Sequence, residues 1–80
     1  MAKNDIIIPM KETVIIEIRD EFITLGQLLK KADIVSNGGE VKFFLAENKV
    51  LVNGEDENRR GKKLYHGDTI EIADVIYKIA

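Results

Sequence analysis

Four cationic side chains flank a single glycine in the second half of the chain. Arg59 and Arg60 precede Gly61, and Lys62 and Lys63 follow it. Arginine presents a planar fork of N–H donors that matches two phosphate oxygens, and lysine adds a mobile point charge. The glycine allows the backbone of such a loop to follow a curved partner closely. The pattern therefore indicates a loop that could hold phosphate groups.

The same cations have a simpler interpretation, because Glu55, Asp56 and Glu57 stand just before them. In this interpretation residues 55–63 are an exposed loop whose charges are solvated or paired with one another. The whole chain has a net charge of −2, which is unusual for a nucleic-acid-binding domain. Residues 30–63, however, carry eight Lys or Arg against six Asp or Glu, whereas the segments on either side are each acidic. The charge distribution leaves both interpretations open.

Two further lysines and a polar turn lie close to this segment in the expected fold. Lys31 is at the end of a predicted helix, and Lys42 is in the first turn of the next one, so both would border the same groove. The turn between the helices contains Asn37, Gly38 and Gly39. Its glycines could leave helix N-terminal amides free for an anion, or they could serve a tight connection that needs positive φ. The two interpretations are compatible.

Hydrophobic periodicity defines the two helices that would position these residues. The first is predicted at about 24–32, where Thr24 and Gln27 have the spacing of a capping box. The second is predicted at about 39–48. Apolar residues recur on one face of each helix, so we expect the two helices to pack on a common core.

Phe43 lies opposite the inner face of the second predicted helix, which carries Val41, Phe44 and Leu45. An exposed phenylalanine there could stack on a nucleic-acid base. The favoured expectation is instead that the N-terminal strand, predicted at 13–18, covers it.

Short β-prone segments alternate with turn signals in the rest of the chain. Asn53-Gly54 is a strong hairpin signal, and residues 55–63 would be the returning arm and its loop. Leu64 and Tyr65 are expected to turn inward, and residues 1–12 to be a poorly ordered start. The predicted strands are 13–18, 50–52, 69–72 and 75–79. The prediction is one α+β domain over 1–80, with two packed helices against a small, mostly antiparallel sheet.

Composition excludes several classes of function. The chain has no cysteine, so it can have neither a disulfide nor a thiolate zinc site. His66 is the sole histidine and stands in a Gly-Asp turn without a nucleophile near it, so we expect no catalysis, no metal and no cofactor. The longest apolar runs are far too short to span a membrane. We expect a cytoplasmic, monomeric protein without a small-molecule substrate.

The order of these features resembles the alpha-L RNA-binding domain, the family named after small-subunit ribosomal protein S-four. The likeness is strongest to its small stand-alone bacterial members, the YaaA type, which share the double glycine, the lysine of the second helix and the Asn-Arg-Arg-Gly-Lys-Lys-Leu run. It covers about 50 residues, from Ile23 to Ile72. The matching residues are Leu25, Glu40-Val41-Lys42, Val50, Val52-Asn53-Gly54, Gly67-Asp68, Ile70 and Ile72.

The resemblance implies an alpha-L motif at about 23–72 and a non-catalytic protein that binds structured RNA by shape and phosphate contacts. It implies ribosomal or transfer RNA, or the ribosome or a subunit, as partner, and a role in ribosome assembly or translation. Many members carry arginine at the positions of Thr24 and Gly38, so two of the usual cations are absent. The RNA-binding residues it implies are Lys31, Asn37, Gly38, Gly39, Lys42, Asn53, Arg59, Arg60, Lys62 and Lys63.

A second class of function stays open beside RNA binding. The fold could serve a small protein–protein interaction adaptor that uses its exposed strand edges or the 55–63 loop. Salt dependence separates the two, because phosphate contacts release counterions and adaptor contacts do not.

Overall fold

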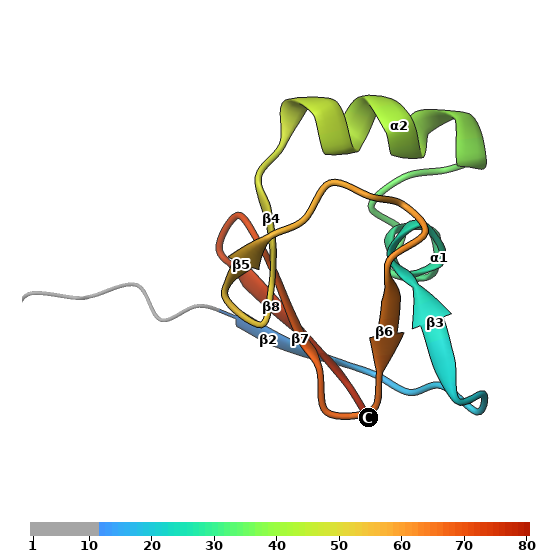
Figure 1. Cartoon of the computed structure of the whole chain (residues 1–80), viewed down its shortest axis with the longest axis vertical. Coiled ribbons are helices and arrows are strands. Elements are labelled where there is room, and N and C mark those ends of the chain that lie inside the picture. The colour runs from blue at the N-terminus through green and yellow to red at the C-terminus, as the bar shows by residue number, and fades with distance from the viewer. Residues whose placement is uncertain (1–11) are drawn as a thin grey trace, which may run out of the picture.

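The structure, a computed structural model, describes residues 12–80 and contains a five-stranded sheet with two helices beside it (Figure 1). The strands follow the order β2-β8-β7-β4-β5, in which β2 and β8 are parallel and the other neighbours are antiparallel. The predicted α+β class and mostly antiparallel sheet are confirmed. The strand bounds are β2 Glu12–Ile16, β4 Val50–Val52, β5 Glu55–Asp56, β7 Thr69–Ile72 and β8 Val75–Ile79.

The N-terminal strand differs slightly from its prediction. It begins at Glu12, inside the segment expected to be a poorly ordered start, and ends at Ile16 rather than at residue 18. Its neighbour is β8, with Val14 opposite Tyr77. The expectation for residues 1–11 lies outside the described part of the chain.

A two-stranded antiparallel ribbon, which was not predicted from the sequence, lies beside the sheet. It pairs β3 (Phe22–Thr24) with β6 (Lys63–Tyr65). Leu64 points inward and is fully buried, but Tyr65 is 43% exposed, so the expectation that both turn inward is wrong for Tyr65. The reason is that consecutive side chains of a strand point to opposite faces.

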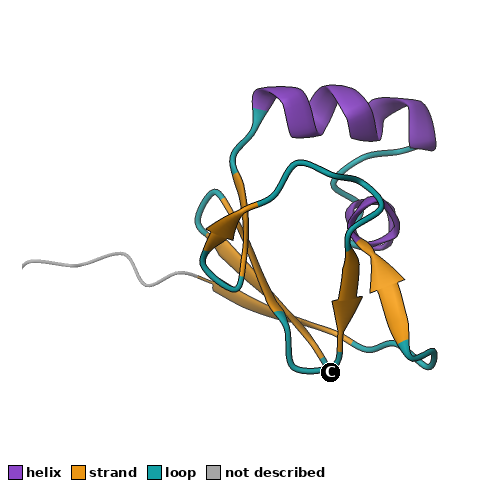
Figure 2. Cartoon of the chain, in the orientation of Figure 1, coloured by secondary structure: helices purple, strands orange, loops and turns teal. Residues whose placement is uncertain are grey.

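Both helices form where they were predicted (Figure 2). Helix α1 spans Leu25–Lys31, and Thr24 and Gln27 make both hydrogen bonds of the predicted capping box. Helix α2 spans Gly38–Glu47, with Asn37 as its N-cap residue. The observed bounds differ from the predicted ones by one residue at each end.

The connection between the helices contradicts one interpretation of its glycines. Gly38 and Gly39 are the first residues of α2, and neither has a positive φ. The positive φ of this connection belongs to Asp33, at 61°. The amides of Asp33 and Ile34 donate to the carbonyls of Lys30 and Leu29, at 3.0 and 2.9 Å, and these bonds close the C-terminus of α1.

The hydrophobic core lies where the helices, the ribbon and the sheet meet. Helix α1 contributes three leucines with no exposed surface, and α2 adds two buried side chains from its inner face. Burial of this apolar surface is the main stabilising term for the fold. The most deeply buried side chains are Leu25, Leu28, Leu29, Val41, Val50, Leu64, Ile70 and Ile79.

Phe43 is not covered, contrary to the favoured expectation. Its side chain is 70% exposed on the outer side of α2. The strand that was expected to cover it, β2, instead lies at the edge of the sheet beside β8.

Asn53 joins two turns of the sheet through its side chain. Its Nδ2 donates to Asp68 Oδ1 at 3.1 Å, and its Oδ1 accepts from the Thr69 amide at 3.0 Å and the Thr69 hydroxyl at 3.3 Å. Asp68 also accepts from the Tyr65 amide at 2.8 Å, within its own turn. Asn53 itself has φ 52° and is followed by Gly54 at φ 87°, the geometry of the predicted hairpin turn.

We expect Asn53→Ala to lower the free energy of unfolding by about 1–3 kcal/mol, because it removes these bonds and places alanine at positive φ. Urea unfolding followed by circular dichroism measures the change. Asn58→Ala is the matched control, since Asn58 is exposed and makes no side-chain hydrogen bond within the described residues. Equal stability of the two variants would show that the bonds between the turns contribute nothing.

Candidate nucleic-acid interface

The loop at residues 57–62 is attached to the start of α1 through its backbone. The amides of Leu25 and Gly26, in the first turn of the helix, donate to the carbonyls of Lys62 and Arg60 at 2.8 and 2.9 Å. These bonds satisfy two of the amides that a helix N-terminus leaves without a partner in the helix. The loop is therefore held in one position relative to both the helix and the β3–β6 ribbon.

Gly26 lies where the loop comes close to the two helices, and this position was not predicted from the sequence. A Cβ atom at this position would lie 3.4 Å from Arg60 Cβ and from the Arg60 carbonyl oxygen, and 3.5 Å from Val41 Cγ1. These are ordinary van der Waals distances, so a methyl group would fit, and only a longer side chain would displace the loop. The available signal was a glycine inside the first turn of a predicted helix, where it has a cost in helix stability and so needs a packing reason.

Arg60 lies between two hollows of the surface. One, of about 370 Å³, is lined by Arg60 with Lys42 and Ala46 of α2. The other, of about 310 Å³, is lined by Arg60 with Lys30 of α1 and Gly38 of α2. Within residues 12–80, none of these three cations has a carboxylate within ion-pair distance. We call Lys30, Lys42 and Arg60 the cation triad.

The start of α2 adds N–H groups to this surface. The Glu40 amide donates to Asn37 Oδ1 at 3.1 Å, while the amides of Gly38 and Gly39 make no hydrogen bond within the described part of the chain. A Cβ atom at Gly38 would meet nothing within 4 Å, so no packing constraint requires glycine there. The Glu40 carboxylate accepts from the Ser36 amide on the same turn.

Arg59 does not join the cation triad, because its guanidinium is held by Glu57. Its Nε and Nη2 donate to the two carboxylate oxygens at 2.8 and 3.1 Å, and its backbone amide donates to Glu57 Oε2 at 3.1 Å. For Arg59 the structure agrees with the interpretation that charges of the 55–63 loop pair with one another.

The ion pair also affects stability at low pH. The side-chain hydrogen bond from Arg59 lowers the pKa of Glu57 from its ordinary value of 4.5 to about 2. Because the folded-state pKa lies below the unfolded-state value, the pair stabilises the fold above about pH 4.5. That contribution is lost as the pH falls from there through about 2.

The remaining predicted residues lie in other surroundings. Lys63 is on the ribbon, with its Nζ 4.8 Å from the centre of the Phe22 ring. Lys62 is half-buried beside the first turn of α1, and Lys31 is at the other end of that helix. The side chain of Asn53 is engaged by the sheet turns described above. Of the predicted set, the structure thus brings together Gly38, Lys42 and Arg60, and it adds Lys30.

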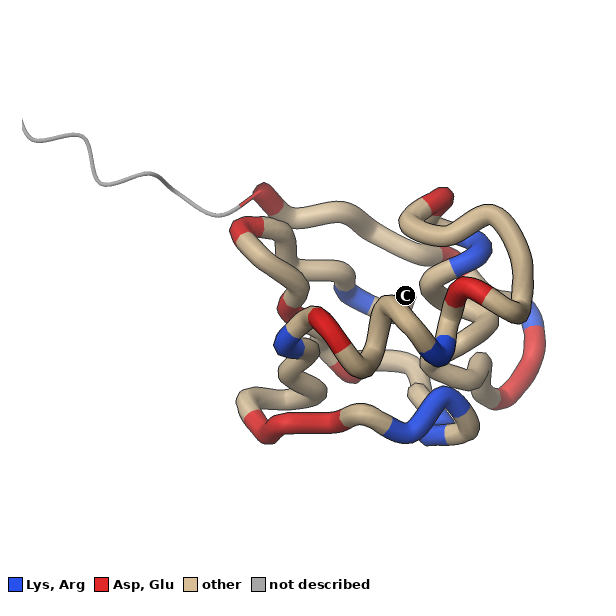
Figure 3. Tube along the Cα trace, turned by 90° about the horizontal axis from the view of Figure 1, so that it is seen from above, with Lys and Arg blue, Asp and Glu red and all other residues tan. Residues whose placement is uncertain are grey.

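Charge of both signs is spread over the molecule when it is seen from above (Figure 3). Acidic and basic segments alternate along the chain, so the interface is a local cluster and not a uniformly basic face. Residues 12–80 contain no group of three or more His, Asp or Glu placed to bind a metal ion. No helix within the same residues is long and apolar enough to cross a membrane.

The sequence is similar to a known protein family and to a named bacterial protein. The family model described as S4 domain matches residues 16–80. A protein of Bacillus subtilis (strain 168) named "Probable ribosome maturation protein RlbA" is 60% identical over 57 residues, which is 71% of this chain and 80% of that protein.

Proposed function

The chain belongs to the S4 domain family, and from this premise we propose that it is a non-catalytic protein that binds structured RNA. The observation that carries the proposal is the cation triad, three unpaired cations gathered around a loop that is fixed to α1 within the described residues. Cations held on a rigid surface can contact several phosphates of one RNA backbone, because less conformational freedom is lost on binding.

Recognition is by shape and phosphate. Arg60 can bind one phosphate through two N–H groups, and Lys30 and Lys42 add charges on either side of it. The free amides of Gly38 and Gly39 supply uncharged donors beside them. A-form RNA suits such a surface, because side chains cannot read its deep, narrow major groove and proteins recognise it mostly by shape and by contacts to phosphates and 2′-hydroxyls.

Ribosomal RNA is the first partner to test. The Bacillus subtilis relative is named for ribosome maturation, and its aligned segment covers most of both chains. We extend that role to this chain, which would then act in the cytoplasm during ribosome assembly or translation. Transfer RNA is the second RNA to test.

The exposed ring of Phe43 favours a second candidate function, a protein–protein interaction adaptor. Phenylalanine is one of the residue types enriched at protein–protein interfaces, and the Phe43 side chain is 70% exposed. In that case the chain would bind a protein of the ribosome and not its RNA, and the affinity would depend little on salt.

The test is a titration of the purified protein with ribosomal RNA over a series of salt concentrations. If the cation triad contacts about three phosphates, log K falls against log salt with a slope of about −2 to −3. Absence of binding at low salt would overturn the proposal and favour the adaptor.

We expect Glu57→Gln to strengthen binding to ribosomal RNA about 5-fold at 0.1 M salt. The slope of log K against log salt should become steeper by up to about 0.9, which is the contribution of one phosphate contact. Arg59 would be released from its carboxylate partner and could reach the RNA. Glu55→Gln is the control, since it removes the same charge while the bonds between Glu57 and Arg59 stay intact. Equal affinities of the two variants would show that Arg59 gains no contact when it is freed.

A further inference from the structure

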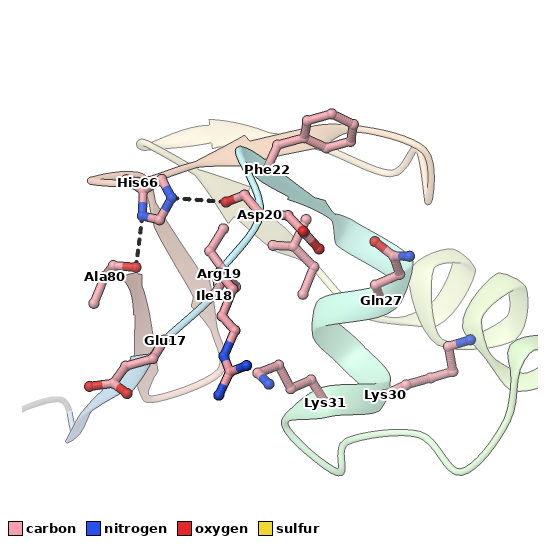
Figure 4. A pocket seen from close by; sticks show the side chains of 11 residues that line it. Glu17, Ile18, Arg19, Asp20, Phe22, Gln27, Lys30, Lys31, His66 and Ala80 are labelled. Atoms are coloured by element: carbon pink, nitrogen blue, oxygen red, sulfur yellow. Dashed lines mark hydrogen bonds between the residues drawn. The ribbon is translucent and has the colours of Figure 1, made fainter.

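A second groove lies on the side of α1 away from α2 (Figure 4). Its volume is about 910 Å³. Its walls come from the loop at residues 17–20, from α1, and from His66 and Ala80. Of the residues that line it, only Lys30 belongs to the cation triad, and only Lys31 was predicted as a site residue.

One wall of the groove is held by hydrogen bonds. The two ring nitrogens of His66 lie 2.8 Å from the Ala80 carbonyl oxygen and 3.0 Å from the Asp20 carbonyl oxygen. The Ala80 amide donates to the Ile16 carbonyl at 2.8 Å. The loop at residues 17–20 is thereby fixed between the sheet and the ribbon.

Two cations converge in this groove without an acid between them. The guanidinium of Arg19 and the ammonium of Lys31 point toward each other from opposite walls, while the Glu17 carboxylate points away from them (Figure 4). Neither cation has a carboxylate within 4.0 Å in the described residues. Like charges that approach repel each other, and an anion placed between them would remove that cost.

The groove also has apolar walls, beside the polar side chains of Asp20, Gln27 and His66. Ile18, Ile23 and Phe22 line it beside the two cations. An inorganic anion would need the cations alone, whereas a nucleotide offers a phosphate and a flat apolar base together. The volume is also large enough for a group of that size.

We propose that this groove holds a nucleotide from a single-stranded stretch of the bound RNA. Its phosphate lies between Arg19 and Lys31, and its base lies against Ile18 and Ile23. Lys30 lines both this groove and the hollow next to Arg60, so the RNA backbone can pass from one to the other along α1. The inference rests on the proposed function and specifies an RNA in which a single strand adjoins a helix.

The groove can be tested with a short RNA that has no structure of its own. Amide resonances of the ¹⁵N-labelled protein are followed during addition of hexauridylate, of uridine 5′-monophosphate and, in a third series, of inorganic phosphate. We expect saturable shifts at residues 18–23, 31 and 66 with hexauridylate, weaker ones with the monophosphate, and the weakest with phosphate. The double variant Arg19→Gln/Lys31→Gln should lose them, and Lys49→Gln/Lys78→Gln, which removes the same charge, should keep them.

A second arm separates this inference from the proposed function. If Arg19→Gln/Lys31→Gln neutralises one phosphate fewer, its affinity for ribosomal RNA should fall about 5- to 10-fold at 0.1 M salt and the slope should flatten by about 0.7–0.9. The inference would be overturned if the wild type binds ribosomal RNA tightly and this variant binds it equally well. It would also be overturned if hexauridylate shifts resonances only outside the groove. Either result would leave the proposal for the cation triad in place. Equal shifts with phosphate and hexauridylate would overturn it too, because the groove would then be an anion site only. Absence of ribosomal RNA binding by the wild type would overturn both.

Discussion

The double variant Lys42→Gln/Arg60→Gln is expected to bind ribosomal RNA about 30- to 100-fold more weakly than the wild type at 0.1 M salt. Each phosphate that the variant no longer neutralises removes about 0.7–0.9 from the slope of log K against log salt. For two phosphates the slope should therefore become shallower by about 1.4–1.8. The size of the effect follows from the position of Arg60, which lines both hollows of the surface and shares one of them with Lys42.

The change should leave the fold intact. Glutamine keeps much of the aliphatic stem of each side chain, and the bond that attaches the loop to α1 uses the Arg60 carbonyl, which the substitution retains. Circular dichroism and thermal unfolding of the variant should therefore match the wild type. Lys49→Gln/Lys78→Gln is the control of equal charge, since both lysines are exposed and lie outside the proposed surface. If the control weakens binding as much, affinity depends on net charge and the triad has no special role.

Local signals in the sequence explain why the helices and the main hairpin could be predicted. The bonds between Thr24 and Gln27 involve residues three apart, and Asn53-Gly54 supplies the positive φ values its own turn requires. Such features are set by neighbours in sequence and need no knowledge of the rest of the fold. The order of these signals also carried the family resemblance, which the S4 domain match over residues 16–80 confirms.

The parts that could not be predicted depend on contacts between distant residues. Strands β3 and β6 have three residues each and pair across about 40 positions in the sequence. Each is too short to show the alternation of apolar and polar residues by which a strand is recognised. The positive φ of Asp33 has no glycine to mark it. Gly26 lies against the backbone of Arg60, which is far away in sequence.

The candidate site shows the same division between local and distant information. Sequence reasoning found the cationic loop and Lys42, but residue types alone could not show that Arg59 faces Glu57 while Arg60, the next residue, has no carboxylate partner among the described residues. Neighbouring residues of an irregular loop can point in different directions, and only the attachment of the loop to α1 decides which cation faces the helices. The predicted set therefore includes residues that the structure places too far apart to form one cluster, and the binding role of the loop stays a prediction.

Truncation of Leu64 should destabilise the core, and this residue also connects the loop to the interior. Leu64 is fully buried, although its ribbon has only two strands, and it follows the loop that presents Arg60. We expect Leu64→Ala to lower the free energy of unfolding by about 2–5 kcal/mol, the range for truncating a buried leucine. A chain of this size has only about 4–12 kcal/mol in total, so much of its stability would be lost.

Equilibrium unfolding in urea measures this change, and Ile15→Ala is the matched control because Ile15 is 54% exposed on β2. The control should cost well under about 1 kcal/mol, since little apolar surface is lost from the interior. At temperatures where Leu64→Ala remains folded, its binding to ribosomal RNA should also weaken, because the loop loses its buried support. If Leu64→Ala lowers the free energy of unfolding by less than about 1 kcal/mol, the surrounding residues fill the cavity at little cost. The backbone hydrogen bonds from Leu25 and Gly26 would then be enough to hold the loop in place.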